Sequence, residues 1–507
     1  MSFLDHMSRG RRHAPPKASA MVEALRGLGY STSTAIADII DNSISACAST
    51  VSVNFHWKGE NSRISILDDG CGMNEEELDH AMRLGDVNPL DARDENDLGR
   101  FGLGLKTASF SQCRRLTVAS MRNNAAHCLR WDLDVLSKSE GDGWYMLEGA
   151  EAGSEQFIED IENKNNGTIV LWEKLDRIIT GSFSVENFLD LIDVVERHLS
   201  MVFHRFLENR SRPFSILING QRLKPWDPFL TGNPSKPWHS PVSPAPTMPG
   251  VEVECHVLPH KDMLSVRDFE EAQGPEGWTA QQGFYVYRNK RLLLAGSWLG
   301  LGSGRAWIKD EAHRLARIRI DIPNSVDSEW KIDIRKSRAR PPVNLRPWLG
   351  QLAEATRMRA RNAFAYRGRV QRSYTGEEIV QAWKPEKGKH GVRYRIDHKH
   401  PSVNAVLDQA GHLRAQIEAM LRVLEETVPV QKIWLDTAEE KDTPRTGFDK
   451  VPVDEVRAVL LQMYKYFVFR NQLSPVDAKV KLKITEPFHN YHQLIDQLPD
   501  DLDEDIS

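Results

Sequence analysis

Asp38 and Asn42 are four residues apart in the segment 32–46, where apolar residues recur at helical spacing. Side chains at this spacing lie on the same face of a helix, so the two polar groups are expected side by side. The carboxylate can orient and deprotonate a water molecule, and the amide oxygen can ligate Mg²⁺. A polar helix face turned to solvent would show the same pair, so the spacing alone leaves both interpretations open.

A third polar group, Asp68, follows the strand-like run 64–67 and is followed by Gly70, Gly72 and Met73. Glycines let the backbone pass close to a flat ring, while a carboxylate can accept a hydrogen bond from an exocyclic amine. The pattern predicts that Asp68 accepts a hydrogen bond from N6 of an adenine. For this segment taken alone, a simple Asp-Gly turn is the alternative.

Three further glycines, Gly99, Gly102 and Gly104, lead into a helix predicted over 103–110. Amide groups at a helix N-terminus can cradle phosphates, and Lys106 adds a positive charge nearby. The segment is not a P-loop, because no Gly-Lys-Ser/Thr follows at the required spacing. Turns and close packing are the alternative explanation of these glycines.

The fourth segment is Gly167 with Thr168, which precedes the apolar strand predicted over 169–172. Thr168 is a candidate for a second hydrogen bond on the adenine side of a pocket, and alone it would count as a loop end. Taken together and in order, the four segments can each be assigned to a different part of one ATP molecule.

This ordered series resembles the GHKL superfamily, which includes gyrase B subunits, heat-shock chaperones of the ninety-kilodalton class, histidine kinases and MutL. The resemblance covers roughly residues 15–175. It implies a Bergerat-type ATP-binding α/β sandwich in which Asp38 is the general base. It further implies that the ligands of Mg²⁺, adenine and the phosphates include Asn42, Asp68, Gly70, Gly72, Met73, Gly99, Gly102, Gly104, Lys106 and Thr168.

One departure from the superfamily concerns the base, which is usually Glu and here is Asp38. An aspartate is one methylene shorter, so the rate of hydrolysis is more in question than the binding of ATP. We therefore expect a slow ATPase, with a non-hydrolysing ATP-gated scaffold or a chaperone-like switch on protein partners as the alternative. A kinase of the histidine-kinase branch is disfavoured, because only 37 residues precede Asp38 and they do not resemble a dimerising helix pair.

Within the superfamily, the segments 35–44, 101–106, 167–172 and 284–289 are most similar to the microrchidia (MORC) group and its prokaryotic relatives. The last segment lies outside the nucleotide domain and implies a transducer-like (ribosomal S5-type) domain. Such a domain sends a cation to the γ-phosphate, where it stabilises developing charge. Lys336 is the preferred candidate because it follows a strand-like alternation and begins a loop; Lys331 and Arg335 are the alternatives.

The expected fold class is α+β. We expect a flexible N-terminal arm at 1–16, an ATP-binding domain at 17–206 and a transducer-like α+β domain at 207–343. A mainly helical C-terminal region follows at 344–507, with a basic segment and an acidic tail.

Composition limits the class of protein further. The 507 residues are 40% hydrophobic, which is ordinary for a folded chain, and contain five cysteines without paired spacing. These cysteines are expected to be reduced thiols, not disulfides or a zinc site. With no signal peptide at the start and no run of 18 apolar residues, a cytoplasmic protein without a membrane span is expected.

The net charge of −5 does not by itself indicate nucleic-acid binding, yet residues 335–372 contain eleven Lys or Arg and a single acidic residue. Arginines on a helix and the following loop can neutralise phosphates of double-stranded DNA. The alternative is a basic helix face that meets acidic surface elsewhere. The candidates for DNA contact are Arg357, Arg359, Arg361, Arg367 and Arg369.

These expectations combine into an ATP-dependent homodimer that works as a clamp on DNA. The loop 84–98 would close over the phosphates as a lid, recruit Lys336 and bring two protomers together. The resemblance implies a setting of restriction, phage defence or DNA maintenance, with helicase or nuclease proteins as possible partners.

Overall fold

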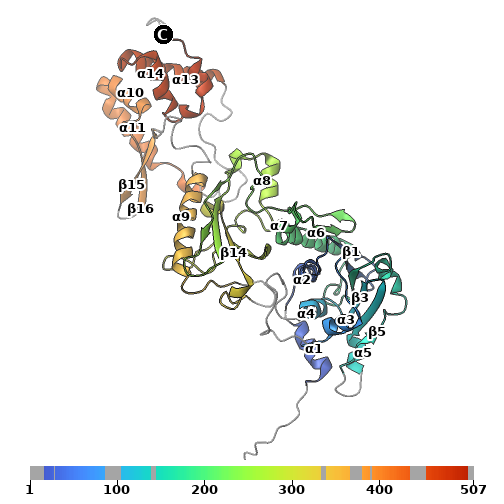
Figure 1. The fold of residues 1–507 in the computed structure, drawn as a ribbon. Coiled ribbons are helices and arrows are strands. Elements are labelled where there is room, and N and C mark those ends of the chain that lie inside the picture. Colours follow the sequence, from blue (N-terminus) through green and yellow to red (C-terminus); the bar gives the residue numbers. More distant parts are fainter. Residues whose placement is uncertain are drawn as a thin grey trace, which may run out of the picture. The chain divides into compact units, whose positions relative to one another are not determined.

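The computed structural model describes residues 16–27, 29–85, 104–138, 144–332, 339–365, 380–388, 391–433 and 453–500. The chain forms two compact units, residues 1–368 and residues 369–507 (Figure 1). The first unit contains two β-sheets with their helices, and the second is mainly helical.

The first sheet has eight strands in the order β5-β4-β3-β6-β2-β1-β7-β8. Neighbouring strands pair antiparallel, except that β1 and β7 are parallel. The strands are β1 (Thr50–His56), β2 (Arg63–Asp68), β3 (Arg115–Arg122), β4 (Ala125–Asp132), β5 (Leu147–Glu148), β6 (Gly167–Glu173), β7 (Ser215–Ile218) and β8 (Gln221–Arg222).

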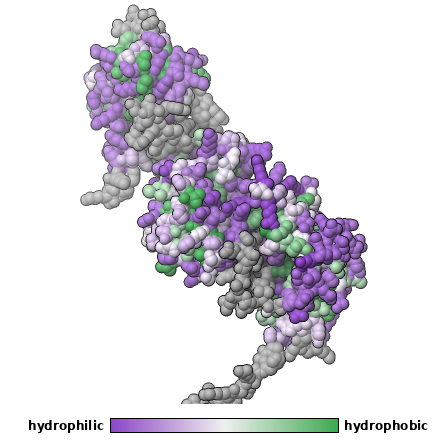
Figure 2. Space-filling model, in the orientation of Figure 1, coloured by the Kyte–Doolittle hydropathy of each residue, from purple (hydrophilic) through white to green (hydrophobic). Residues whose placement is uncertain are grey.

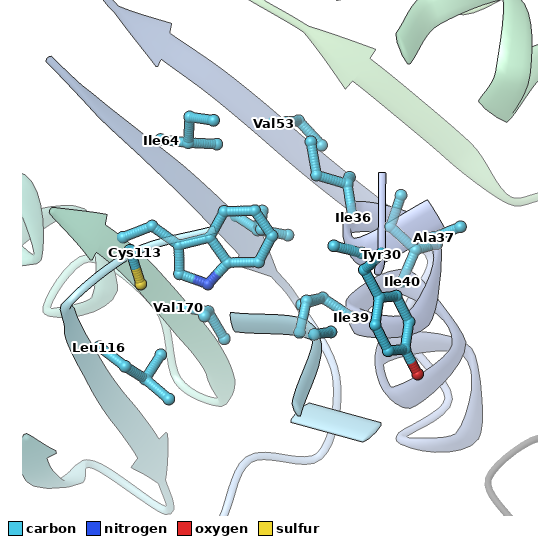
Figure 3. Close-up of a cluster of buried hydrophobic side chains, with 14 of the residues drawn as sticks. Tyr30, Ile36, Ala37, Ile39, Ile40, Val53, Ile64, Cys113, Leu116 and Val170 are labelled. Carbon is cyan, nitrogen blue, oxygen red and sulfur yellow. The ribbon is translucent and has the colours of Figure 1, made fainter. Parts of the chain in front are cut away.

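Helix α2 (Thr32–Ser45) is the central helix of this domain. Its N-terminus is capped by Ser31, whose hydroxyl accepts a hydrogen bond from the Thr34 amide. Its apolar side chains share one buried cluster with strand residues; Figure 3 shows Ile36, Ile39 and Ile40 with Val53, Ile64 and Val170. This apolar side fixes the helix on the sheet, so its polar residues are held at defined positions. The remaining helices of the domain are α1 (Ala18–Arg26), α3 (Glu75–Met82), α4 (Gly104–Phe110), α5 (Leu133–Lys138), α6 (Val185–Val202) and α7 (His204–Leu207).

The second sheet has the strand order β10-β11-β14-β12-β13, with β9 paired to β11. All six residues of β12 are buried, and the four central ones alternate between two clusters. Phe284 and Val286 join the apolar core that includes α9, whereas Tyr285 and Tyr287 join a cluster with Met201 of α6. The elements are β9 (Trp238–His239), β10 (Ser243–Pro244), β11 (Glu252–Val257), β12 (Gly283–Arg288), β13 (Arg291–Ser297), β14 (Ala316–Ile322), α8 (Val266–Ala272) and α9 (Arg346–Ala365).

Two domain boundaries expected from the sequence differ from the observed packing. Strands β7 and β8 complete the first sheet although they follow residue 206. Helix α9 follows residue 343 but packs against β11 and β14 of the second sheet. Both differences arise from tertiary contacts, which composition along the chain does not record.

The second unit contains the two-stranded sheet β15 (Trp383–Gly388) and β16 (Gly391–Ile396) in addition to helices. Its core includes Leu460, Tyr464, Phe467 and Leu482. The helices are α10 (Pro401–Gln409), α11 (Arg414–Glu426), α13 (Val453–Lys465), α14 (Pro475–Lys483) and α15 (His492–Asp496). The expected α+β class is confirmed at the level of an N-terminal α/β sheet, a second sheet and a helical C-terminal part.

Hydrophilic residues predominate on the face shown in Figure 2. Within the ranges that the structure describes, no helix combines the length and the apolar character needed to cross a bilayer.

Candidate active site

Asp68 lies at the end of β2, directly opposite Thr168 at the start of β6. Its Oδ2 accepts a hydrogen bond of 2.8 Å from the Ser43 hydroxyl of α2, and its Oδ1 accepts one of 2.9 Å from the Gly70 amide. Burial raises the pKa of the Asp68 carboxyl above its ordinary value, while the hydrogen bonds from Gly70 and Ser43 oppose that rise. Two residues predicted to contact adenine are thus adjacent, and Ser43 ties them to α2.

The glycines of this region allow very close backbone approaches. A Cβ at Gly72, where φ is +66°, would lie 1.9 Å from the Met121 carbonyl oxygen. A Cβ at Gly167 would lie 2.4 Å from the Asp68 carbonyl oxygen, and one at Gly70 would lie 2.9 Å from atoms of Ala46. Packing within the protein therefore requires these glycines, and their presence alone does not demonstrate a ligand.

Ser120 of β3 links the remaining residues at this end of the site. Its hydroxyl accepts a hydrogen bond of 2.8 Å from the Met73 amide and lies 2.9 Å from the Thr168 hydroxyl. Neither Ser120 nor Ser43 was among the sequence-based candidates. Ser43 directly follows Asn42, which is a local signal, whereas Ser120 becomes recognisable only from its register opposite Thr168.

Asp38 lies on α2 and is only 4% exposed. Its Oδ2 accepts a hydrogen bond of 3.1 Å from the Tyr30 hydroxyl, which in Figure 3 points away from the apolar cluster. Its Oδ1 is 3.5 Å from Nη2 of Arg291. Asn42 lies one turn further along α2 and is exposed. The expected helix therefore carries both groups, although their surroundings differ.

Arg291, at the start of β13, is a charged residue of this site that the sequence did not single out. Its Nε is 3.1 and 3.0 Å from the two carboxylate oxygens of Asp41 on α2. The only local signal would have been its position two residues after the segment 284–289. The second sheet thus supplies a cation to α2.

Lys106 of α4 is buried, and its ammonium donates a hydrogen bond of 2.9 Å to the Ala81 carbonyl oxygen in the last turn of α3. A cation is favourable there because the carbonyl end of a helix carries partial negative charge. This contact holds Lys106 against α3, and the expected phosphate contact of Lys106 stays a prediction. Gly104 begins α4, and a Cβ at that position would meet no atom of the described residues within 4 Å.

Several other expected site residues lie outside the described residues. These are Gly99, Gly102, Lys336 and the predicted lid from residue 86 onward. Their roles stay predictions.

The arginines expected to contact DNA differ in their exposure to solvent. Arg357 is buried, with its guanidinium 4.7 and 5.0 Å from the ring centres of Trp298 and Trp307 and 3.6 Å from Asp310. We therefore withdraw Arg357 as a surface contact, because its charge is directed into the second domain.

Arg359 and Arg361 of α9 are exposed, and the Arg359 guanidinium lies 4.1 Å from the ring centre of Trp238. Arg367 and Arg369 lie outside the described residues.

The chemistry of these side chains fits a nucleotide bound together with Mg²⁺. Asp68 offers a buried carboxylate to an amine, and Asn42 offers an exposed amide oxygen. Within the described ranges, no group of three or more His, Cys, Asp or Glu side chains could hold a metal ion alone. Mg²⁺ commonly takes one or two protein ligands and completes its shell with phosphate oxygens and water, so Asn42 suits a metal that arrives with ATP.

Comparison with known proteins supports this assignment. Residues 30–168 match the family described as histidine kinase-, DNA gyrase B- and HSP90-like ATPase. The chain is also 26% identical over 194 residues to a protein named ATPase morc-1 from Caenorhabditis elegans. That alignment covers 32% of this chain and 22% of the worm protein. The N-terminal sheet region is therefore a GHKL-type ATPase domain with distant similarity to a MORC ATPase.

Proposed function

We propose that this chain binds Mg²⁺-ATP beside α2 and the paired ends of β2 and β6, and hydrolyses it slowly to ADP and phosphate. The observation that carries the proposal is the position of Asp68, a buried carboxylate opposite Thr168. Ser43 links Asp68 to the same helix that presents Asp38 and Asn42. In finer detail, we assign the N-terminal domain to the Bergerat type and the second domain to the S5-type transducer.

In the proposed reaction, Asp38 orients a water molecule and accepts its proton, while the Tyr30 hydroxyl fixes the direction of the carboxylate. Asn42 holds Mg²⁺, which when bound supplies positive charge to the phosphate oxygens. Asp68 and Thr168 hold the adenine end. Because aspartate is shorter than the usual glutamate, its carboxylate reaches less far from α2, which supports a low rate.

The decisive test measures ATP binding and steady-state hydrolysis by the wild type and by Asp38→Ala, with and without duplex DNA. We expect both proteins to bind ATP and only the wild type to release phosphate. Loss of a general base typically lowers the rate by about 10²–10⁴-fold. Normal turnover by Asp38→Ala would exclude Asp38 as the base, and absence of ATP binding by the wild type would refute the proposal.

A second candidate function is an ATP-gated scaffold that binds ATP without hydrolysing it. The observation in its favour is that the two carboxylate oxygens of Asp38 face Tyr30 and Arg291, respectively. Bound ATP with no phosphate release, together with ATP-dependent association of two copies, would support the scaffold.

We further propose that ATP binding closes a homodimeric clamp on double-stranded DNA, with the exposed arginines of α9 as contacts. The support is the exposure of Arg359 and Arg361 and the similarity to a MORC ATPase over part of the chain. By the same resemblance, we propose a cytoplasmic role in restriction, phage defence or DNA maintenance beside helicase or nuclease proteins. Lys336 remains our proposed contact to the γ-phosphate.

A further inference from the structure

A buried ion pair joins the second sheet to the helix that carries the proposed base. Arg291 begins β13, and its side chain is 5% exposed; that of Asp41 on α2 is 1% exposed. The Arg291 Nε contacts both oxygens of Asp41, and its Nη1 donates a hydrogen bond of 2.8 Å to the Leu292 carbonyl oxygen. The remaining nitrogen, Nη2, is 3.5 Å from Oδ1 of Asp38. One guanidinium therefore lies against two carboxylates that are three residues apart on α2.

The surroundings leave this guanidinium little freedom. It lies 5.9 Å from the ring centre of Phe203. Burial lowers the pKa of nearby His198 to about 4, and the positive charge of Arg291 acts in the same direction. His198 is thus neutral near pH 7 and does not replace Arg291 as the counter-charge of the two aspartates. Because a buried charge without its partner is strongly unfavourable, α2 and β13 are held together wherever the pair persists.

The second sheet also makes polar contacts with α7, a helix other than α2. His204 of α7 is 2.8 Å from the Tyr287 hydroxyl, and Arg205 of α7 forms an ion pair with Asp321 of β14. These contacts fasten α7 to the second sheet. Arg291 instead reaches α2, on the turn that carries Asp38.

We infer that Arg291 is a positioning residue that couples the second sheet to ATP hydrolysis. Through Asp41 it fixes α2 to β13, and through Asp38 it sets the orientation of the base. A shift of the second sheet relative to α2 would separate these charges and change the direction of the Asp38 carboxylate. The inference rests on the proposed ATPase function and adds a route by which the second domain controls the rate.

The test compares Arg291→Gln, Asp41→Asn and the double variant by thermal unfolding, ATP affinity, kcat and KM. Arg291→Gln removes the guanidinium that contacts Asp41 and Asp38, and Asp41→Asn removes the carboxylate that contacts Arg291, so we expect each single variant to have a lowered melting temperature. The double variant removes both charges of the Arg291–Asp41 pair, so stability and ATP affinity should return part of the way towards those of the wild type. Its kcat should stay roughly tenfold or more below wild type, because Asp38 keeps its contact with Tyr30 but still lacks the one with Arg291.

If the double variant does not fold, a conservative variant of Arg291 still tests the inference. Arg291→Lys keeps a positive charge for Asp41, but one compact ammonium cannot reproduce the contacts that the wider guanidinium makes with both aspartates. We expect near-normal stability and KM with a reduced kcat. The matched control is Arg288→Gln with Asp327→Asn, which removes a buried ion pair of 2.5 Å within the second domain. This control should leave kcat unchanged.

The outcomes separate the two proposals. Wild-type kcat in Arg291→Lys, or in a stable double variant, would overturn the positioning role while leaving the ATPase proposal in place. Absence of hydrolysis by the wild type would refute the ATPase proposal, and the coupling with it. Recovery of stability and ATP binding without recovery of kcat would establish Arg291 as a positioning residue.

Discussion

At the scale of single residues, the carboxylates of this site are held by hydrogen bonds from neighbouring groups of the same domain. Asp68 receives hydrogen bonds from Ser43 and Gly70, and Asp38 receives one from Tyr30. A carboxylate fixed in this way has a defined direction, which recognition of an amine and orientation of a water both require.

Asp68→Asn should weaken ATP binding. The amide replaces one acceptor oxygen by an NH₂ group, which would face the Ser43 hydroxyl, the Gly70 amide or the adenine amine. An unsatisfied buried polar group costs about 1–3 kcal/mol, so we expect ATP affinity to fall by roughly 5- to 150-fold. Titration calorimetry with ATP and with inosine triphosphate, which lacks the exocyclic amine, measures both affinity and selectivity.

Asp69→Asn is the matched control for this experiment. The Asp69 carboxylate accepts hydrogen bonds from the backbone of Ser49 and Thr50, so its substitution should affect the turn and leave nucleotide selectivity intact. Equal preference for ATP over inosine triphosphate in the wild type and Asp68→Asn would contradict the adenine assignment.

At the scale of helices and strands, local periodicity predicted the elements that carry the site. The helix expected over 32–46 is observed over Thr32–Ser45, and the one expected over 103–110 over Gly104–Phe110. The strands expected over 64–67 and 169–172 are observed over Arg63–Asp68 and Gly167–Glu173, so Asp68, Gly167 and Thr168 lie within the strands. These elements were predictable because the spacing of their apolar residues matches their period.

Contacts between elements were not predictable from local sequence. Ser120 lies in the site because β3 pairs with β6 in a register that places Ser120 opposite Thr168. Arg291 contacts Asp41, which precedes it by 250 positions in the chain. Helix α9 shows the same limit, because composition does not distinguish a buried arginine such as Arg357 from exposed Arg359 and Arg361.

The exposed face of α9 supports a prediction about DNA. Replacing Arg359 and Arg361 together by Ala should weaken duplex binding and reduce its salt dependence. Each lost phosphate contact lowers the magnitude of the slope of log K against log salt by about 0.9, so loss of two contacts gives about 1.8. Fluorescence anisotropy at several salt concentrations measures this slope.

Arg267→Ala, which changes an exposed arginine paired with Glu271 on α8, is the control and should leave the slope unchanged. An unchanged slope in the α9 variant would remove this face from the proposed clamp.

At the scale of the whole molecule, the first unit contains two sheets. Ion pairs connect helices α2 and α7 to strands β13 and β14 of the second sheet. Arg291 contacts Asp41, and Arg205 pairs with Asp321. A nucleotide that shifts α2 therefore acts on the second sheet through specific groups. Such a change requires that ATP bind the two arrangements with different affinity.

Buried histidines in this unit make its stability depend on pH. Burial lowers the pKa of His256 on β11 to about 4, although Glu254 opposes the shift. Below the unfolded-state pKa of about 6.5, the unfolded chain binds a proton that the folded protein does not bind until about pH 4. Stability therefore falls as pH decreases through this interval, by up to about 1.4 kcal/mol per pH unit for one histidine.

His256→Phe should reduce this loss of stability in acid. The substitution removes the titrating group and keeps an aromatic ring near Phe229, whose ring centre lies 4.4 Å from that of His256. We expect the free energy of unfolding, measured by urea denaturation at pH 7, 6 and 5, to decline less steeply than in the wild type. Some decline should persist, because the pKa of His198 is also lowered to about 4. Parallel pH profiles for the two proteins would show that His256 does not contribute, and would place the acid sensitivity in other groups.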